Sequence, residues 1–148
     1  MDQEIIKKAG DIIASLSGHG ATDGTEPYCT LALIDDEGYP TASTITVSKS
    51  EGIQWITFCT GLSSNKVKRI EKCNRASVCF NSLQYNLTLV GDIEVITDPA
   101  VKKEMWYDGL KYVFTGGDSD PDYCVLMFKT RRYNLMIDYK EAVGRLDK

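Results

Sequence analysis

The stretch that decides the fold is residues 86–97, which read NLTLVGDIEVIT. Apolar and polar side chains alternate along it, as they do in a strand with one buried face. Gly91 stands in the middle, where the lack of a side chain allows the sharp bend that a small barrel needs at its corners. The stretch therefore predicts one long strand of a β-barrel.

Shorter strands are predicted on both sides of this stretch. Four apolar or β-branched runs precede it. The turn signals 35–38 and 49–52 separate the first three, which indicates an antiparallel meander. Two closing strands and a polar, frayed tail follow it. The predicted strands are 28–34, 41–47, 53–60, 76–80, 86–97, 123–129 and 132–138, and the tail is 140–148.

Helical spacing of apolar residues appears in three places, 4–16, 64–73 and 99–110. Asp98 and Pro99 supply a cap and a first-turn proline for the last of these. Gly-rich polar loops are expected over 18–24 and 114–122. We predict one α+β domain over 1–148, a mostly antiparallel barrel with peripheral helices. Side chains fill a barrel of six or seven strands, so a ligand must bind at its rim or at a subunit interface.

Composition argues against nucleic acid and membranes as partners of this chain. The chain has 148 residues, is 43% hydrophobic and carries a net charge of −4, which argues against a nucleic-acid partner. No window is apolar and long enough for a membrane span, and the start MDQE is not that of a signal peptide. We expect a soluble, cytoplasmic protein.

The cysteines do not form a metal or disulfide pattern. They number five, no two form a C-x-x-C pair, and Cys29, Cys59, Cys79 and Cys124 lie in apolar runs. We interpret them as reduced, buried thiols and expect no metal site. The single histidine, His19, is interpreted as a loop residue rather than the partner of a nucleophilic cysteine.

Anion-binding features concentrate in residues 60–66, TGLSSNK. The segment leaves a strand, turns at a glycine and enters a helix that Ser63 or Ser64 can cap. Thr60, Ser64 and Lys66 offer hydroxyl and ammonium donors beside the helix start, which suits a phosphate. The alternative is an ordinary serine cap with a solvated lysine.

The order of these segments resembles the pyridoxamine 5′-phosphate oxidase-like, FMN-binding split-barrel family, in particular its general stress protein 26-like branch. The likeness runs from about residue 5 to 138. The segments that resemble the family are 38–43 (GYPTAS), 55–60 (WITFCT), 64–67 (SNKV) and 114–122 (FTGGDSDPD). The resemblance also includes the strand that contains Gly91, followed by Asp98 and the helix that carries Trp106.

The resemblance implies a six- to seven-stranded split barrel and a homodimer with two shared FMN sites. Thr60, Ser64 and Lys66 would hold the phosphate, and Trp106 of the partner subunit would cover the site. The alternative for Trp106 is an aromatic residue that only packs its own helix. The resemblance further implies that the backbone beside the isoalloxazine ring is that of Ser43, Thr44, Ile45 and Thr46.

At several positions this chain departs from the family pattern, and these departures change the expected cofactor affinity and activity. Ser43 and Asn65 stand where many members carry phosphate-binding arginines, so FMN is expected to bind weakly. The pair Arg145-Leu146 is similar to the end of true pyridoxamine phosphate oxidases but lacks their surrounding tryptophan and proline, so we do not expect that activity.

Three functions stay open. The first is an FMN-dependent oxidoreductase that transfers hydride to or from a small substrate. The second is a non-catalytic flavin- or nucleotide-binding stress protein, and the third is a haem-binding barrel with His19 as ligand.

Overall fold

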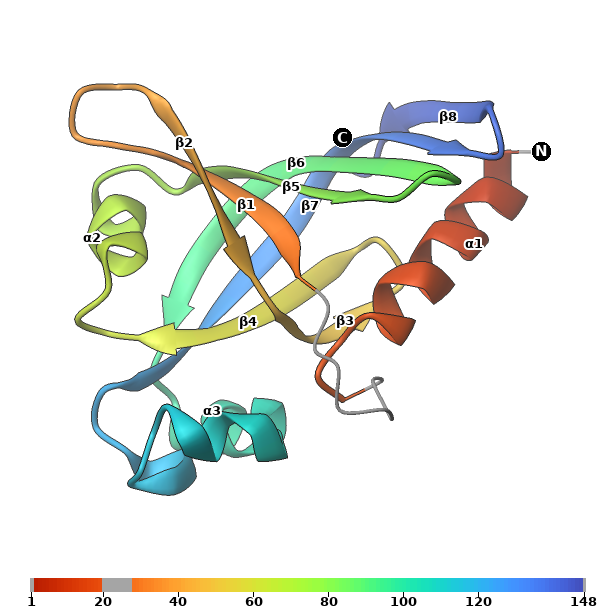
Figure 1. Cartoon of the computed structure of the whole chain (residues 1–148). Helices are drawn as coiled ribbons and strands as arrows, with labels where there is room; N and C mark the ends of the chain where they lie inside the picture. Colours follow the sequence, from red (N-terminus) through yellow and green to blue (C-terminus); the bar gives the residue numbers. More distant parts are fainter. Residues whose placement is uncertain (1, 20–27, 148) are drawn as a thin grey trace.

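One antiparallel sheet organises the computed structural model, which describes residues 2–19 and 28–147 (Figure 1). Its strands follow the order β2-β1-β5-β6-β7-β4-β3, and β8 pairs with β7 beside this path. The bounds are β1 Cys29–Ile34, β2 Pro40–Ile45, β3 Val47–Glu51, β4 Trp55–Gly61, β5 Arg75–Asn81, β6 Tyr85–Ile96, β7 Tyr123–Ile137 and β8 Lys140–Arg145. The predicted α+β split barrel is confirmed, with β8 as an added strand. The loop predicted over 18–24 lies mostly outside the described residues.

The two edges of the sheet meet at one residue. β2 and β3 lie at opposite ends of the strand order, yet only Thr46 separates them along the chain. The sheet must therefore curl until its edges come together at Thr46. The predicted single strand over 41–47 and the meander are wrong, because β2 pairs with β1 whereas β3 pairs with β4. Ile45 and Val47 are both buried, so the alternation continues through the change of partner and does not reveal it.

The predicted turn at 49–52 is also displaced. β3 continues to Glu51, and Gln54 donates a hydrogen bond from its backbone N–H to the Glu51 carbonyl at 2.9 Å. Gly52 occupies the bend with a φ of 53°, a conformation that favours glycine. The tight turn therefore comes later in the chain than predicted.

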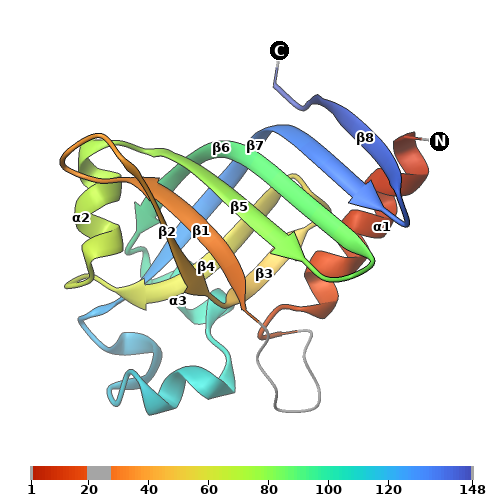
Figure 2. The same ribbon diagram turned by 45° about the horizontal axis from the view of Figure 1, so that its top comes forward.

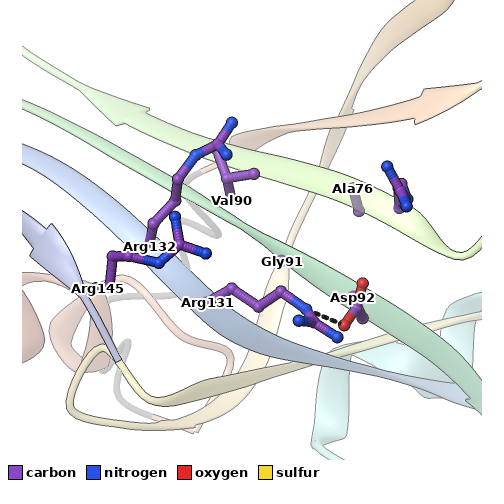
Figure 3. Close-up of a pocket in the computed structure, with 8 residues that line it drawn as sticks. Ala76, Val90, Gly91, Asp92, Arg131, Arg132 and Arg145 are labelled. Carbon is purple, nitrogen blue, oxygen red and sulfur yellow. Dashed lines mark hydrogen bonds and ion pairs between the residues drawn. The ribbon is translucent and has the colours of Figure 1, made fainter. Parts of the chain in front are cut away.

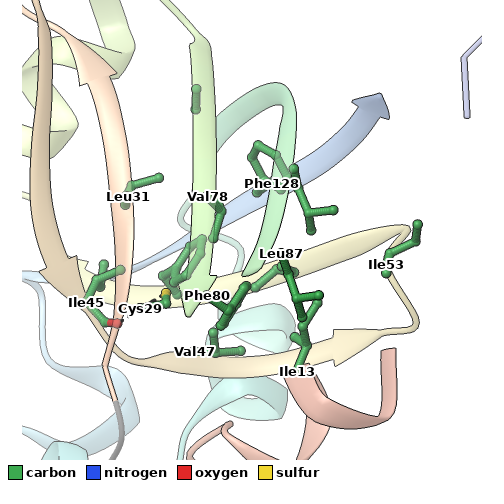
Figure 4. Packing of buried hydrophobic residues seen from close by; sticks show 14 of the residues in the cluster. Ile13, Cys29, Leu31, Ile45, Val47, Ile53, Val78, Phe80, Leu87 and Phe128 are labelled. Carbon is green, nitrogen blue, oxygen red and sulfur yellow. Dashed lines mark hydrogen bonds between the residues drawn. The ribbon is translucent and has the colours of Figure 1, made fainter. Parts of the chain in front are cut away.

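Apolar side chains fill the barrel interior (Figure 4). Phe58, Phe80 and Phe128 come from β4, β5 and β7, and none is more than 2% exposed. Full burial of such a side chain contributes about 1.5–3 kcal/mol. Helix α1 (Asp2–Ser15) packs against β3, β7 and β8 and adds Ile13 to this core. Helix α2 (Asn65–Lys72) packs against β1 and β6.

A second apolar cluster covers the outer face near β4 and β7. Helix α3 (Pro99–Met105) begins at Asp98, whose carboxylate accepts the Ala100 N–H at 2.8 Å. It ends earlier than predicted, and the short 3-10 segments Asp108–Tyr112 and Gly117–Ser119 follow. The buried members of the cluster are Met105, Leu110, Phe114, Tyr123 and Val125.

The last third of the sheet differs from the sequence prediction in two ways. β7 is one strand of 15 residues, where two strands were predicted. The tail is not frayed over 140–145, because β8 pairs with β7 from Lys140 opposite Ile137 to Arg145 opposite Arg132. Ala142 is the buried residue of β8, and one small apolar side chain gives little signal in a sequence.

Candidate functional site

The strands on either side of Thr46 pair with different partners, so β2 and the end of β4 are not paired with each other (Figure 1). This interruption of strand pairing is here called the split. Val47 lies opposite Phe58, so the junction sits beside the middle of β4. β2 approaches the junction from Ser43, and β4 leaves it toward Thr60. At about 3.3 Å per residue, Ser43 lies roughly 10 Å along β2 from Thr46, and Thr60 lies roughly 7 Å along β4 from Phe58. The two strands that border the split therefore each carry a hydroxyl side chain near it, Ser43 on β2 and Thr60 on β4.

Helix α2 begins shortly after the end of β4 that borders the split. Ser64 caps the helix, and its Oγ accepts the N–H of Val67 at 3.4 Å. Thr60 Oγ1 lies 3.5 Å from Ser64 Oγ. Helix geometry leaves the N–H groups of Asn65 and Lys66 without intrahelical acceptors and adds a positive partial charge. Thr60, Ser64, Asn65 and the half-buried Lys66 therefore form one polar cluster, here called the α2 cluster.

Asp122 is a member of this region that sequence reasoning missed. Its carboxylate accepts the Ser63 N–H at 3.0 Å and lies 3.2 Å from Ser63 Oγ. The Leu62 N–H binds the Asp122 carbonyl at 2.6 Å. A side chain on Gly61 would place its Cβ 2.5 Å from Asp122 Oδ2, so the carboxylate can keep this position only beside a glycine. The contact fixes the loop before α2 to the start of β7 and brings a negative charge beside the α2 cluster.

The residues of β2 do not share one face. Ser43 lies opposite the fully buried Leu31 and so belongs to the inner face, as does Ile45, which is 9% exposed. Thr44 points outward and is exposed. Thr46 is half-buried at the junction. A ligand along β2 would therefore meet the backbone of all four residues but hydroxyls from alternate faces.

Outward side chains of β1, of β2 and of the middle of β5 form a surface without charge, and Arg75 at the start of β5 lies beyond it. Figure 2 shows these three strands on one side of the barrel, with no helix in front of them. The face is defined by the pairing of outward residues across neighbouring strands. Its members, here called the small-residue face, are Thr30, Ala32, Ala42, Thr44, Ser77 and Cys79.

Trp106 lies within its own subunit's second apolar cluster. It caps the C-terminal end of α3, and its ring meets that of Tyr123 edge to face, with centroids 5.3 Å apart. The indole is half-buried. The structure thus gives Trp106 a packing role, and its expected role over a partner's site stays a prediction.

Polar groups also converge on the Met105 carbonyl. Ser48 Oγ donates to it at 2.5 Å, and His19 Nε2 lies 3.1 Å from it. Cys59 Sγ is 3.7 Å from the same oxygen. Burial raises the pKa of the Cys59 thiol to about 11, which disfavours the nucleophilic thiolate. This arrangement stabilises the end of α3 and does not form a Cys/His nucleophile.

The described residues form neither a disulfide nor a cluster of metal ligands. All five cysteines are described and none is in a disulfide; Cys29 and Cys124 are buried and the other three are half-buried. Within residues 2–19 and 28–147, no three His, Cys, Asp or Glu side chains gather as metal ligands. None of the helices in these ranges has the length and apolar character to cross a bilayer.

Comparisons of structure agree on this fold. A protein related to general stress protein 26, from Clostridium acetobutylicum, is 24% identical, and the match covers 99% of this chain and 96% of that one with a TM-score of 0.79. A pyridoxamine 5′-phosphate oxidase-related, FMN-binding protein from Nostoc punctiforme is 13% identical, with coverages of 99% and 95% and a TM-score of 0.63. A heme-binding protein from Mycobacterium smegmatis is 18% identical, with coverages of 95% and 57% and a TM-score of 0.71. At these identities the likeness shows the fold alone.

Comparisons of sequence identify the family. No curated protein gives a significant match. A family model described as pyridoxamine 5′-phosphate oxidase like matches residues 25–134, which is most of the chain. The chain therefore belongs to the pyridoxamine 5′-phosphate oxidase-like family.

Proposed function

We propose that this chain binds FMN in the split between β2 and β4, with the phosphate at the start of α2. The observation that carries the proposal is the α2 cluster, in which two hydroxyls lie together at the start of the helix and Lys66 stands in its first turn. Each member of this set can donate a hydrogen bond, so the set fits a phosphate. The family model and the FMN-binding neighbour from Nostoc support the same cofactor.

Three residues limit the strength of phosphate binding. Ser43 and Asn65 are uncharged at positions where the family resemblance places arginines. Asp122 adds a negative charge at Ser63, next to the helix start. Lys66, in the first turn of α2, supplies the full positive charge of the cluster. We therefore expect weak FMN binding that depends strongly on Lys66.

The free edge of β2 suits the flavin ring. β2 pairs with β1 along one side, and it ends the strand order on the other. Backbone N–H and C=O groups of an edge strand lack a ladder partner on that side and can hydrogen-bond a ligand. In the proposed complex, the backbone from Ser43 to Thr46 contacts the polar edge of the ring.

The proposed assembly is a homodimer that joins two small-residue faces. Uncharged side chains such as Ala32, Ala42 and Ser77 allow two sheets to approach closely and require no desolvation of charge. Such a contact would cover the free edge of β2 and enclose the split. Light scattering at micromolar concentration should give about twice the 16.5 kDa chain mass.

The proposed activity is that of an FMN-dependent oxidoreductase acting on a small substrate. Bound FMN would supply hydride transfer, while the protein supplies position and electrostatics. Thr60, Ser64 and Lys66 anchor the phosphate, and the backbone of β2 orients the ring. The competing proposal is a flavin carrier without catalysis, for which the weak phosphate cluster is the argument. A haem protein is disfavoured because His19 Nε2 is engaged at the Met105 carbonyl.

The test compares FMN with riboflavin, which has the same ring but no phosphate. A charge-assisted hydrogen bond contributes about 1.5–3 kcal/mol. Lys66→Ala should therefore weaken FMN binding by about ten- to a hundredfold and leave riboflavin binding nearly unchanged. Flavin fluorescence quenching measures both Kd values, and the wild-type preference for FMN should shrink in high salt.

Lys68→Ala is the matched control, since Lys68 is an exposed lysine on the same helix. It should leave both Kd values within about twofold of wild type. Equal weakening of both ligands by Lys66→Ala would indicate a disturbed fold, and no effect on either would place the phosphate elsewhere.

Reduction of the bound flavin tests the catalytic part. Stopped-flow bleaching of the flavin band by NADH or NADPH, followed by reoxidation in air, is the expected behaviour of an oxidoreductase. Reduction by dithionite alone would favour the carrier. A Soret band in freshly purified protein would instead favour haem.

A further inference from the structure

An arginine-lined groove lies on the outer face of β5, β6, β7 and β8, which are not the strands that border the split. One cavity of about 340 Å³ is lined by Arg75 of β5, by Arg131 and Arg132 of β7 and by Arg145 of β8 (Figure 3). A neighbouring cavity of about 350 Å³ shares Arg132 and Arg145. Its further lining includes Val90, Tyr133 and Val143.

A β-bulge explains why two consecutive arginines line the same groove. In a regular strand Arg131 and Arg132 would point to opposite faces. Here Val90 pairs with Arg132 and Gly91 pairs with Thr130, so Arg131 is an extra residue on β7. Gly91 permits this, because a Cβ there would lie 2.0 Å from the Lys129 carbonyl oxygen. Both guanidinium groups therefore remain at the outer surface.

The groove contains more positive charge than its carboxylates neutralise. Arg131 is bound by Asp92 and by Asp147, whose Oδ2 lies 3.3 Å from its Nη1. Arg145 also binds Asp147, at 2.8 Å. Arg132 lies directly opposite Arg145 on the paired strands, an arrangement that destabilises a sheet when like charges meet.

Two of the four arginines have no carboxylate partner. Over residues 2–19 and 28–147, neither Arg75 nor Arg132 forms an ion pair. Four guanidinium groups thus face two carboxylates, which leaves two positive charges in excess. A bound dianion would neutralise this excess and relieve the repulsion between Arg132 and Arg145.

We propose that this groove binds the phosphate of a small organic phosphomonoester. Such a phosphate carries a charge of about −1.5 to −2 at pH 7, which matches the excess. Guanidinium groups donate paired hydrogen bonds to phosphate oxygens, and Arg132 can do so. Arg145 binds Asp147 through Nε and Nη2, so its remaining N–H groups can add to the contact from the adjacent strand. The organic part then lies in the neighbouring cavity, along Val90 and Val143.

The test locates phosphate binding by NMR. ¹⁵N-labelled Lys66→Ala protein, in which the α2 cluster is weakened, is titrated with inorganic phosphate and with phenyl phosphate at constant ionic strength. Saturable shifts are expected at the amides of Arg131, Arg132 and Arg145, with tighter binding of phenyl phosphate. Because the readout is at β7 and β8, it does not depend on whether the split holds FMN.

Substitution of Arg132 sharpens the test. Arg132→Gln should weaken phenyl phosphate by about tenfold or more. Lys129→Gln removes the same charge from the same strand outside the groove and should change the Kd by less than about twofold. Arg145→Gln repeats the test if Arg132→Gln lowers the melting temperature.

Four results would overturn the proposal: shifts confined to residues 65–67, shifts that do not saturate, an equal effect of Lys129→Gln, or dissociation of a dimer by Arg132→Gln. The last result would identify the groove as a subunit contact.

Discussion

Gly91→Ala should strongly destabilise the fold, and the structure gives the reason in distances. An alanine Cβ would lie 2.0 Å from the Lys129 carbonyl oxygen and 3.1 Å from Thr130 Cα, whereas ordinary contact begins at 3.4 Å. Both obstacles are backbone atoms of the β7 bulge, so β6 and β7 must separate where they pair. Overpacking of this kind costs about 3 kcal/mol at the upper end of its usual range. For a chain of this length that lowers the melting temperature by roughly 6–12 °C.

Gly61→Ala is the matched control for this prediction. Its Cβ would also meet an oxygen, at 2.5 Å, but that oxygen is Oδ2 at the end of the Asp122 side chain and can rotate away. Its stability cost should stay within about 1 kcal/mol. Circular dichroism melts of both variants measure the difference. If Gly91→Ala melted with the wild type, or if the two glycines cost the same, the argument from backbone obstruction would be refuted.

Three further predictions follow from charge and burial. Asp122→Asn keeps an acceptor for the Ser63 N–H but removes a negative charge, so FMN affinity should rise by roughly two- to fivefold while riboflavin affinity stays constant in the same quenching assay. The Arg145 guanidinium holds the pKa of Asp147 below its ordinary value of 3.8. The ionised carboxylate therefore stabilises the fold above pH 3.8, and this stabilisation is lost as the pH falls through the lowered pKa. In Asp147→Asn, the free energy of unfolding measured in urea should therefore depend less on pH in the acid range. Burial raises the pKa of Cys29 to about 12, so mass spectrometry at pH 8 should find this thiol unalkylated until the protein unfolds.

Local patterns in the sequence predicted most of the individual elements. The strands 28–34, 76–80 and 86–97 agree with β1, β5 and β6 to within about a residue at each end. The Asp98 cap is also where the sequence places it, and α2 is capped by Ser64, one of the two serines that the sequence offers. These features depend on the spacing of apolar side chains and on contacts between residues three or four positions apart. Both can be read directly from a single sequence.

The pairing of strands could not be read from the same patterns. Thr46 joins two strands with different partners, yet burial alternates through it without a break. β8 has one buried side chain, Ala142, and is held by its ladder with β7 rather than by its own propensity. In the candidate site, Ser63 and Asp122 meet across 59 residues of chain, and no local signal announces such a contact. Local sequence patterns therefore do not predict which distant segments pair with each other.

In the proposed complex, the split binds the cofactor and also borders the subunit contact. A closed barrel has no unpaired strand edge, whereas this sheet leaves β2 as an edge because the chain crosses to β3 at Thr46. An uncovered edge invites uncontrolled pairing with other chains, and β2 carries no charged side chain to prevent it. The proposed dimer resolves this problem, because a second small-residue face would cover the edge while the ring occupies its backbone groups. On this argument flavin binding and dimerisation are coupled, and FMN should raise the melting temperature of the dimer by an amount that grows with the logarithm of the ratio of FMN concentration to Kd.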